Sequence, residues 1–132
     1  MIHYAGRLID HVHLVVRDLE RSRAFYEAAL RAVGRDLTHR HEKAFASDEL
    51  YVSAGNPNGP THLAFRAKDR EAVHRFWEAA CAAGGRDNGA PGERPYHPGY
   101  YAAFVLDPDG NNIEVVFHGE AKRSAPSVVI EW

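Results

Sequence analysis

The first stretch of the chain changes its hydrophobic period from two to about 3.6, which predicts a strand followed by a helix. Residues 9–16 alternate between apolar and polar positions, and Asp18 then opens a helical pattern that runs to Val33 and stops at Gly34. Aspartate is a good N-cap because its carboxylate accepts hydrogen bonds from first-turn amides, and glycine suits the left-handed residue after the last turn. The pattern therefore predicts one strand–helix unit in this part of the chain.

The same pattern returns 51 positions further along the chain. When residues 11–36 are shifted onto residues 62–87, eleven positions are identical without a gap, and His11 falls on His62. In the second copy Asp69 takes the place of the N-cap and the Gly84–Gly85 pair ends the helix. An identity of this length covers more than one element, so a supersecondary unit is duplicated.

Each predicted helix is followed by three short extended segments, and Asp107–Gly110 reads as the turn of the last hairpin. Residues 56–60, which alternate Asn, Pro and Gly, cannot continue a strand or a helix and read as a linker. We therefore expect an α+β fold in one domain, with two tandem βαβββ modules that form a curved half-barrel sheet with the helices outside. The predicted strands after the helices are 36–41, 43–47, 49–53, 86–88, 100–106 and 111–117. The expected divisions of the chain are module one 9–55, linker 56–60, module two 61–118 and tail 119–132.

Composition narrows the class of protein without naming a function. The 132 residues are 45% hydrophobic and 26% charged, as in an ordinary globular domain, and the net charge of -2 does not favour nucleic acid as a partner. No apolar run approaches the length of a membrane span, so we expect no membrane association and a cytoplasmic location. The single cysteine, Cys81, lies in an apolar helical pattern and is interpreted as core in a reducing compartment.

Alternation along the strands separates the side chains that pack under the helices from those that point away. Val12, Leu14 and Val16 form the packing set of the first strand. On a flat, open sheet the opposite set would only be solvated, but two copies of a curved sheet would enclose a cavity there. The polar residues on this opposite set are His11, His13, His62, Arg66, Asn112, Glu114 and His118.

Two imidazoles and one carboxylate are a suitable ligand set for a divalent transition metal. His11, His62 and Glu114 would supply three ligands and leave positions open for water or substrate. The set does not distinguish Fe, Mn, Ni and Zn, and no local metal motif supports it, so the hypothesis depends on the fold bringing distant residues together. The alternative is that the two histidines only fill a hydrogen-bonded polar seam.

The remaining candidates are polar or aromatic residues near this predicted site. His13 is a candidate general acid or base, and module symmetry places Tyr51 opposite Glu114, which is itself a catalytic candidate as well as a ligand. Four further residues are predicted to contact the substrate: Arg66, His97, Tyr101 and His118. Each could instead have only a structural role, as a solvated strand end or in aromatic packing.

Three strings, IDHVHLVVRDLERSRAFYEAAL, THLAF and AFVLDPDGNNIEVVF, span residues 9–118 and resemble the vicinal oxygen chelate superfamily, which includes glyoxalase I, bleomycin-resistance proteins, fosfomycin-resistance thiol transferases and extradiol dioxygenases. The resemblance implies the same ligand set, His11, His62 and Glu114. Tyr51 stands where glyoxalase I has a fourth ligand, a glutamate, which argues against that activity. His13 stands where the thiol transferases have a threonine.

The resemblance implies a small metal-dependent enzyme that acts on a small oxygen-chelating substrate, with the lyase or isomerase, thiol-transferase and dioxygenase reactions unresolved. The alternative is a metal-free small-molecule-binding module of the bleomycin-resistance type. The apolar tail over residues 127–132 is expected to cover a sheet edge or a partner subunit, and a homodimer is expected. Whether the modules are exchanged between subunits stays open.

Overall fold

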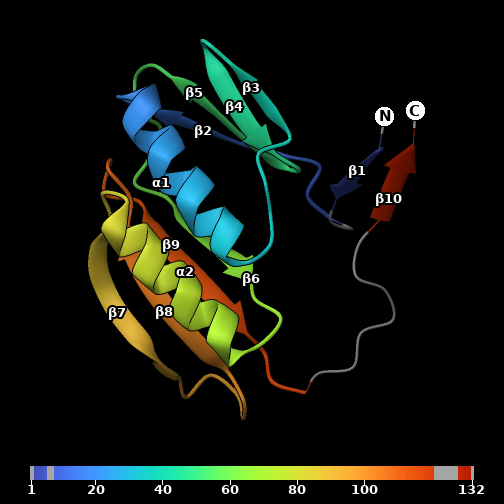
Figure 1. Cartoon of the computed structure of the whole chain (residues 1–132), viewed down its shortest axis with the longest axis vertical. Helices are drawn as coiled ribbons and strands as arrows, with labels where there is room; N and C mark the ends of the chain where they lie inside the picture. Colours follow the sequence, from blue (N-terminus) through green and yellow to red (C-terminus); the bar gives the residue numbers. More distant parts are fainter. Residues whose placement is uncertain (1, 6–7, 121–127, 132) are drawn as a thin grey trace.

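The computed structural model describes residues 2–5, 8–120 and 128–131, and within them the two tandem modules are confirmed (Figure 1). Each module contains one helix and one four-stranded sheet in the same order along the chain. Module one contains β2 (Val12–Val16), α1 (Leu19–Ala32), β3 (His39–His41), β4 (Ala44–Ser47) and β5 (Leu50–Ala54). Module two contains β6 (His62–Arg66), α2 (Arg70–Ala82), β7 (Arg86–Glu93), β8 (Tyr101–Leu106) and β9 (Asn112–Phe117).

The two sheets have the same topology, as a duplicated unit requires. Their strand orders are β2-β5-β4-β3 and β6-β9-β8-β7, and in each the first strand lies parallel to the last while the other pairs are antiparallel. The described strands of one sheet do not pair with those of the other, so each module keeps its own curved sheet and no closed barrel forms. We call the sheet face that carries the helix the outer face, and the opposite one the inner face.

The predicted helix caps are present in both modules. The Asp18 carboxylate accepts from the Arg21 amide at 3.2 Å, and the Asp69 carboxylate accepts from the Ala72 amide at 2.7 Å. Gly34 follows α1 with φ +79°, a left-handed conformation that L side chains rarely adopt. The capping residues that the sequence predicted therefore set the start and the end of the helices.

Alternation along the strands is also confirmed. Leu14 and Val16 on β2 and Ile113 and Val115 on β9 are buried on the outer face, while His62 on β6 is exposed. The buried core between sheets and helices combines aromatic and β-branched side chains with leucines and alanines, as apolar strand faces under amphipathic helices require.

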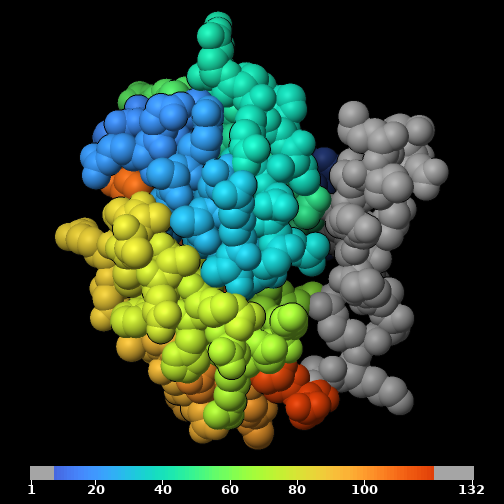
Figure 2. All heavy atoms as spheres, in the orientation of Figure 1, coloured from blue at the N-terminus to red at the C-terminus, as the bar shows by residue number. Residues whose placement is uncertain are grey.

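The modules contact each other through their helices, which lie side by side in front of the sheets (Figure 1), and the contact is filled in the space-filling view (Figure 2). A Cβ on Gly85, after α2, would lie 2.7 Å from the Phe25 ring of α1. The Tyr26 hydroxyl donates to Asp107, in the turn between β8 and β9, at 2.5 Å. Among the described elements, the main contact between the modules is therefore that of α1 with α2, on the outer side of the sheets.

Residue 58, in the predicted linker, closes part of the open edge of β2. The Asn58 side-chain oxygen accepts from the Val15 amide at 3.0 Å, and its side-chain nitrogen donates to the His13 carbonyl at 2.9 Å. One amide group thus replaces a neighbouring strand at this point, which satisfies two backbone groups of an edge strand.

Two features differ from the sequence expectation. β7 is longer than the predicted 86–88 segment, with register shifts around Gly89 and Gly92. The sequence pattern did not predict this length, because glycines have no side chain to mark the alternation of a strand. In addition, β1 (Ile2–Ala5), which was not predicted, pairs antiparallel with β10 (Val128–Glu131) from the tail. Ser127 and Trp132 of the predicted tail segment lie outside the described residues. Neither α1 nor α2, the helices of the described chain, has the length and hydrophobicity to cross a bilayer.

Candidate functional site

A buried carboxylate marks the inner face of the second sheet. Glu114 on β9 is only 4% exposed although it points away from the helix. One of its oxygens, Oε1, lies 3.0 Å from His62 Nε2, and the other, Oε2, accepts from the Tyr100 hydroxyl. A carboxylate on an otherwise open sheet face is thus held in one orientation by two neighbouring side chains.

The contacts of His62 fix which of its ring nitrogens carries a hydrogen. Nδ1 lies 3.0 Å from the Asn112 carbonyl oxygen, which only accepts, so Nδ1 must be the donor. In the neutral imidazole Nε2 is then an acceptor, yet it faces a carboxylate oxygen of Glu114. Two acceptors at hydrogen-bond distance require a cation between or beside them, either a proton or a metal ion.

The distance between these two acceptors also suits a metal ion. In octahedral coordination, adjacent donor atoms ~2.1 Å from a metal are at a right angle to each other and lie ~3.0 Å apart. The Nε2–Oε1 distance in the structure is 3.0 Å. His62 and Glu114 therefore fit as two adjacent ligands of a divalent ion, with the tautomer of His62 already set by a backbone carbonyl.

Tyr100 is coupled to this carboxylate. Burial, followed by the hydrogen bond to Glu114, raises the pKa of Tyr100 to about 12. At neutral pH the phenol therefore keeps its proton and remains a donor to Glu114. The ring also contacts His118 at 5.1 Å and His97 at 5.3 Å between centroids.

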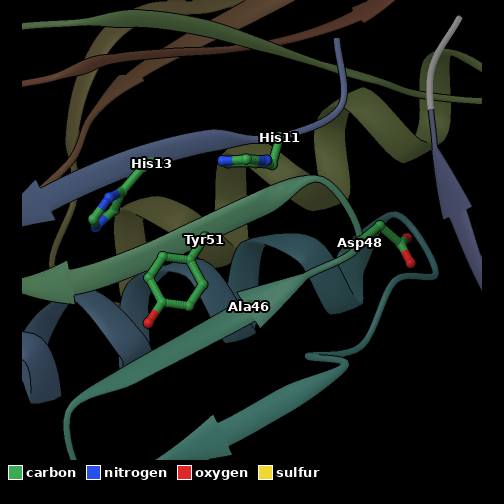
Figure 3. A pocket seen from close by; sticks show the side chains of 5 residues that line it. All are labelled: His11, His13, Ala46, Asp48 and Tyr51. Atoms are coloured by element: carbon green, nitrogen blue, oxygen red, sulfur yellow. The ribbon is translucent and has the colours of Figure 1, made fainter.

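A second polar cluster lies on the inner face of the first sheet, around a pocket of about 380 Å³. His13 lies on the edge strand β2 with His11 just before it, Tyr51 lies beside them on β5, and Asp48 lies in the turn before β5 (Figure 3). His13 Nε2 lies 2.7 Å from the Ser53 hydroxyl, and its ring lies 4.9 Å from that of Tyr51. The volume is within the range of small-molecule sites, ~300–1,000 Å³.

Within the described residues of one chain, His11 does not lie together with His62 and Glu114. His11 belongs to the pocket of the first sheet, where its Nδ1 lies 2.7 Å from Asp10, and its side chain is 67% exposed. No group of three His, Cys, Asp or Glu side chains within the described ranges lies close enough to hold a metal. The helices join the modules, so one chain presents two half-sites, and the three-ligand set stays a prediction.

The same separation affects Tyr51. It was expected to face Glu114 across a common site, but within the chain its ring packs against His13 in the first half-site. Within one chain Tyr51 therefore lies on the inner face of its own sheet and does not face Glu114.

Three of the predicted substrate contacts lie at the second half-site. His97 and His118 stack with centroids 5.2 Å apart, and His97 Nε2 lies 2.9 Å from His118 Nδ1. Arg66 ends β6 and is opposite Val116 in register. His97 and His118 are therefore linked to Glu114 through the Tyr100 ring, and Arg66 shares the face of β6 that carries His62.

Tyr101 is misplaced in the sequence prediction. It begins β8 and lies on the outer face, where its hydroxyl is 2.6 Å from His74 Nε2 and its ring lies under the Arg70 guanidinium at 4.5 Å. The neighbouring Tyr100 reaches Glu114 instead. Tyr101 shares the face of Ala103 and Val105, which are buried under the helix, so alternation along β8 points it away from Glu114.

Three residues that we did not predict as site residues also lie in the two half-sites. Tyr100 contacts Glu114 at the second sheet, and Ser53 and Asp48 lie at the first sheet. Ser53 follows Tyr51 by two positions and so shares its face, a signal that alternation alone provides. Asp48, in the turn, has φ +49°, a conformation that aspartate tolerates better than most residues. Its place in the pocket depends on the turn and could not be read from a strand pattern.

Comparison with known proteins places the chain in a family. A family model described as the Glyoxalase/Bleomycin resistance protein/Dioxygenase superfamily matches residues 8–115, and the chain belongs to this superfamily. No curated protein matches the chain.

Solved structures agree with the family. A glyoxalase/bleomycin resistance protein from Albidiferax ferrireducens T118 is 30% identical with a TM-score of 0.71, covering 83% of this chain and 98% of its own. A glyoxalase/bleomycin resistance protein/dioxygenase family enzyme from Burkholderia phytofirmans PsJN is 25% identical with a TM-score of 0.65, covering 81% and 95%. A lactoylglutathione lyase from Agrobacterium tumefaciens, 18% identical with a TM-score of 0.63 over 85% and 94%, shows the shared fold alone.

Proposed function

We propose that the protein is a metal-dependent enzyme of this superfamily that acts on a small oxygen-chelating substrate. The observation that carries the proposal is the contact between His62 Nε2 and Glu114 Oε1, two acceptor atoms held 3.0 Å apart by other hydrogen bonds. Such a pair is stable only with a cation, and its spacing suits a divalent metal.

A second copy of the chain would complete the site. Two protein ligands hold a transition metal poorly, whereas a catalytic site normally has three and keeps an open position. His11 is the third ligand of the predicted set, but it lies in the other half-site of its own chain. In a closed two-fold dimer, module one of each chain can face module two of the other, so that two identical sites form.

The bound ion would be Fe, Mn, Ni or Zn, and it would polarise an oxygen of the substrate or lower the pKa of a bound water. The chain itself positions the reacting groups. Tyr100 donates to Glu114 and fixes its carboxylate, while Asn112 fixes the ring of His62. His13, with Ser53 at 2.7 Å, is the candidate to take a proton from the substrate or return it, and Tyr51 beside it is a donor to substrate oxygen.

The second candidate function is a metal-free module that sequesters a small molecule. The same contact supports it if the cation at the His62–Glu114 pair is a proton, because an imidazolium and a carboxylate then form a closed ion pair. The pocket of about 380 Å³ on the first sheet would hold the ligand in either case.

Metal content separates the two functions. The protein, purified without an affinity tag or chelator and incubated with Fe, Mn, Ni and Zn in turn, is expected to hold about one ion per chain by elemental analysis. His62→Ala and Glu114→Ala should remove the ion. His74→Ala, which changes a histidine on the outer face, should keep it. A folded wild-type protein that stays free of all four ions would support the metal-free module and refute the enzyme.

Complementation between chains tests where the third ligand comes from. His11→Ala and Glu114→Ala chains are each expected to bind no metal alone. When equal amounts are mixed and allowed to exchange subunits, half of the dimers are mixed, and each mixed dimer has one intact site, so about a quarter of the wild-type metal content should return. Recovery near zero, with subunit exchange shown by mass spectrometry, would refute a site shared between two chains.

A further inference from the structure

One arginine on the inner face of the second sheet is fixed in position without a carboxylate. Arg94 follows β7, and its Cζ lies 5.4 Å from the centroid of the Phe104 ring. Its Nη2 donates to the Ala90 carbonyl at 3.0 Å, and its Nη1 donates to the Glu93 carbonyl at 3.4 Å. An aromatic face and two backbone oxygens therefore orient the guanidinium, and neither neutralises its charge.

The backbone around the guanidinium leaves space for it. A Cβ on Gly89 would lie 3.2 Å from Arg94 Nη2, and a Cβ on Gly92 would lie 3.1 Å from Nη1. Gly89 has φ +148°, and the register of β7 against β8 shifts at both glycines. A side chain at either position would crowd the guanidinium, so two glycines and two irregularities of one strand accommodate a single arginine.

The charge of Arg94 stands out among the described residues. Only Arg23 and Arg94 are half-buried arginines there, and the others are exposed. Arg23 lies 3.2 Å from Glu20, whereas Arg94 forms no ion pair with any described acid. A partly desolvated cation normally has an anionic partner, so the part of the protein that the structure describes leaves a place for one.

Neighbouring acids are already engaged. Glu93, next to Arg94 in the chain, pairs with Arg70 at 2.7 Å. Glu114 pairs with His62 and accepts from Tyr100. Neither carboxylate turns toward Arg94, so the missing partner is not supplied by rotation of the nearest acids as they stand.

The position of Arg94 relates it to the candidate metal pair. Phe104, on which it stacks, lies directly opposite Glu114 on β9 and opposite Gly89 on β7 in the sheet register. The His62 ring stacks on the same phenylalanine with centroids 6.1 Å apart. The guanidinium and the His62–Glu114 pair thus share one aromatic ring on one sheet face, close enough to touch different parts of the same small molecule.

We propose that Arg94 binds an anionic group, a carboxylate or a phosphate, on the molecule whose oxygens approach His62 and Glu114. The inference rests on the proposed function, because it takes this inner face to be the substrate site. A guanidinium has five N–H donors, and two of its terminal nitrogens here each use one on a backbone oxygen. The remaining donors suit the paired oxygens of an oxyanion. The protein is therefore selective for anionic substrates.

Isothermal titration calorimetry with oxalate, inorganic phosphate and uncharged catechol tests this selectivity. Wild-type protein should bind one of the two anions, and the one that binds identifies the class. Arg94→Met should weaken that binding by at least about tenfold. Arg94→Lys, which keeps the positive charge but lacks the planar pair of N–H donors, should weaken it less. The affinity for catechol should not change between Arg94→Met and wild type.

Arg23→Met is the matched control, because Arg23 is also half-buried and its Cζ lies 6.0 Å from the centroid of an aromatic ring, that of Phe45, but it belongs to module one. It should leave anion binding unchanged. The proposal is overturned if the wild type binds neither anion, if both Arg94 variants bind as well as the wild type, or if Arg23→Met causes the same loss. If Arg94→Met does not fold by circular dichroism, Arg94→Lys decides between these outcomes.

Metal analysis of the same proteins keeps the two proposals apart. Arg94→Met should retain the ion that Glu114→Ala loses, since Arg94 is not a ligand. If the wild-type protein holds metal and Arg94→Met binds the anion as well as the wild type does, the role of Arg94 is refuted and the enzyme proposal stands. A metal-free protein whose anion binding is lost in Arg94→Met refutes the metal-dependent enzyme and supports the anion site.

Discussion

Tyr26→Phe removes one hydroxyl from the contact that joins the modules. Tyr26 on α1 is fully buried, and its hydroxyl donates at 2.5 Å to Asp107, which is 3% exposed and lies in the turn of module two. Burial and the nearby Asp107 carboxylate raise the pKa of Tyr26 well above its ordinary value, so the hydroxyl stays protonated and donates. The ring of phenylalanine fills the same volume, which keeps the loss close to that of the hydrogen bond itself.

The magnitude follows from what Asp107 retains. Its carboxylate still accepts from the Asp109 amide at 2.9 Å and from the Asn111 amide and side chain at 2.8 Å each. One of several hydrogen bonds to a buried carboxylate is lost, and a hydrogen bond to a charged group contributes ~1.5–3 kcal/mol. We therefore expect the free energy of unfolding to fall by ~1.5–3 kcal/mol, with no change of the denaturant slope.

Urea unfolding at neutral pH, followed by tryptophan fluorescence and circular dichroism, measures the change. Tyr96→Phe is the control, because it removes the same group from a side chain that is 66% exposed, and it should change stability little. A Tyr26→Phe protein within ~0.5 kcal/mol of wild type, or equal losses in both variants, would refute the assignment of this hydrogen bond as a stabilising contact between the modules.

Two further substitutions test packing and pH dependence. Gly85→Ala would place a Cβ 2.5 Å from Val105 Cγ1, so overpacking should lower the free energy of unfolding by ~1–3 kcal/mol, and an unchanged urea midpoint would contradict the close approach. Hydrogen bonds from the Gly89 amide and then from Trp77 lower the pKa of Asp87 below 3.8, so its contribution to stability is present above about pH 4 and is lost as the pH falls through the lowered folded-state value. In Asp87→Asn the free energy of unfolding should therefore fall less at acid pH than it does in the wild type. Parallel pH profiles of the two proteins would exclude this contribution.

Local chemistry in the sequence determined the elements and their faces. The shift of hydrophobic period placed the strands and helices, Asp18 and Asp69 marked the helix starts, and alternation put His11, His62 and Glu114 on the faces away from the helices. These features depend on residues within a few positions of one another, so one chain's sequence contains them. The resemblance of its three strings to a known superfamily is confirmed by the family match.

Long-range packing decided the rest. The sequence reading assumed that the two sheets enclose one cavity, whereas the helices join the modules and divide the polar residues into two half-sites. Arg94 gained its position beside two glycines that weaken the strand pattern, and Tyr100, just before β8, reached Glu114 while Tyr101 lies on the outer face. How modules dock and where a strand begins depend on contacts between residues far apart in the chain, and a local pattern does not record those contacts.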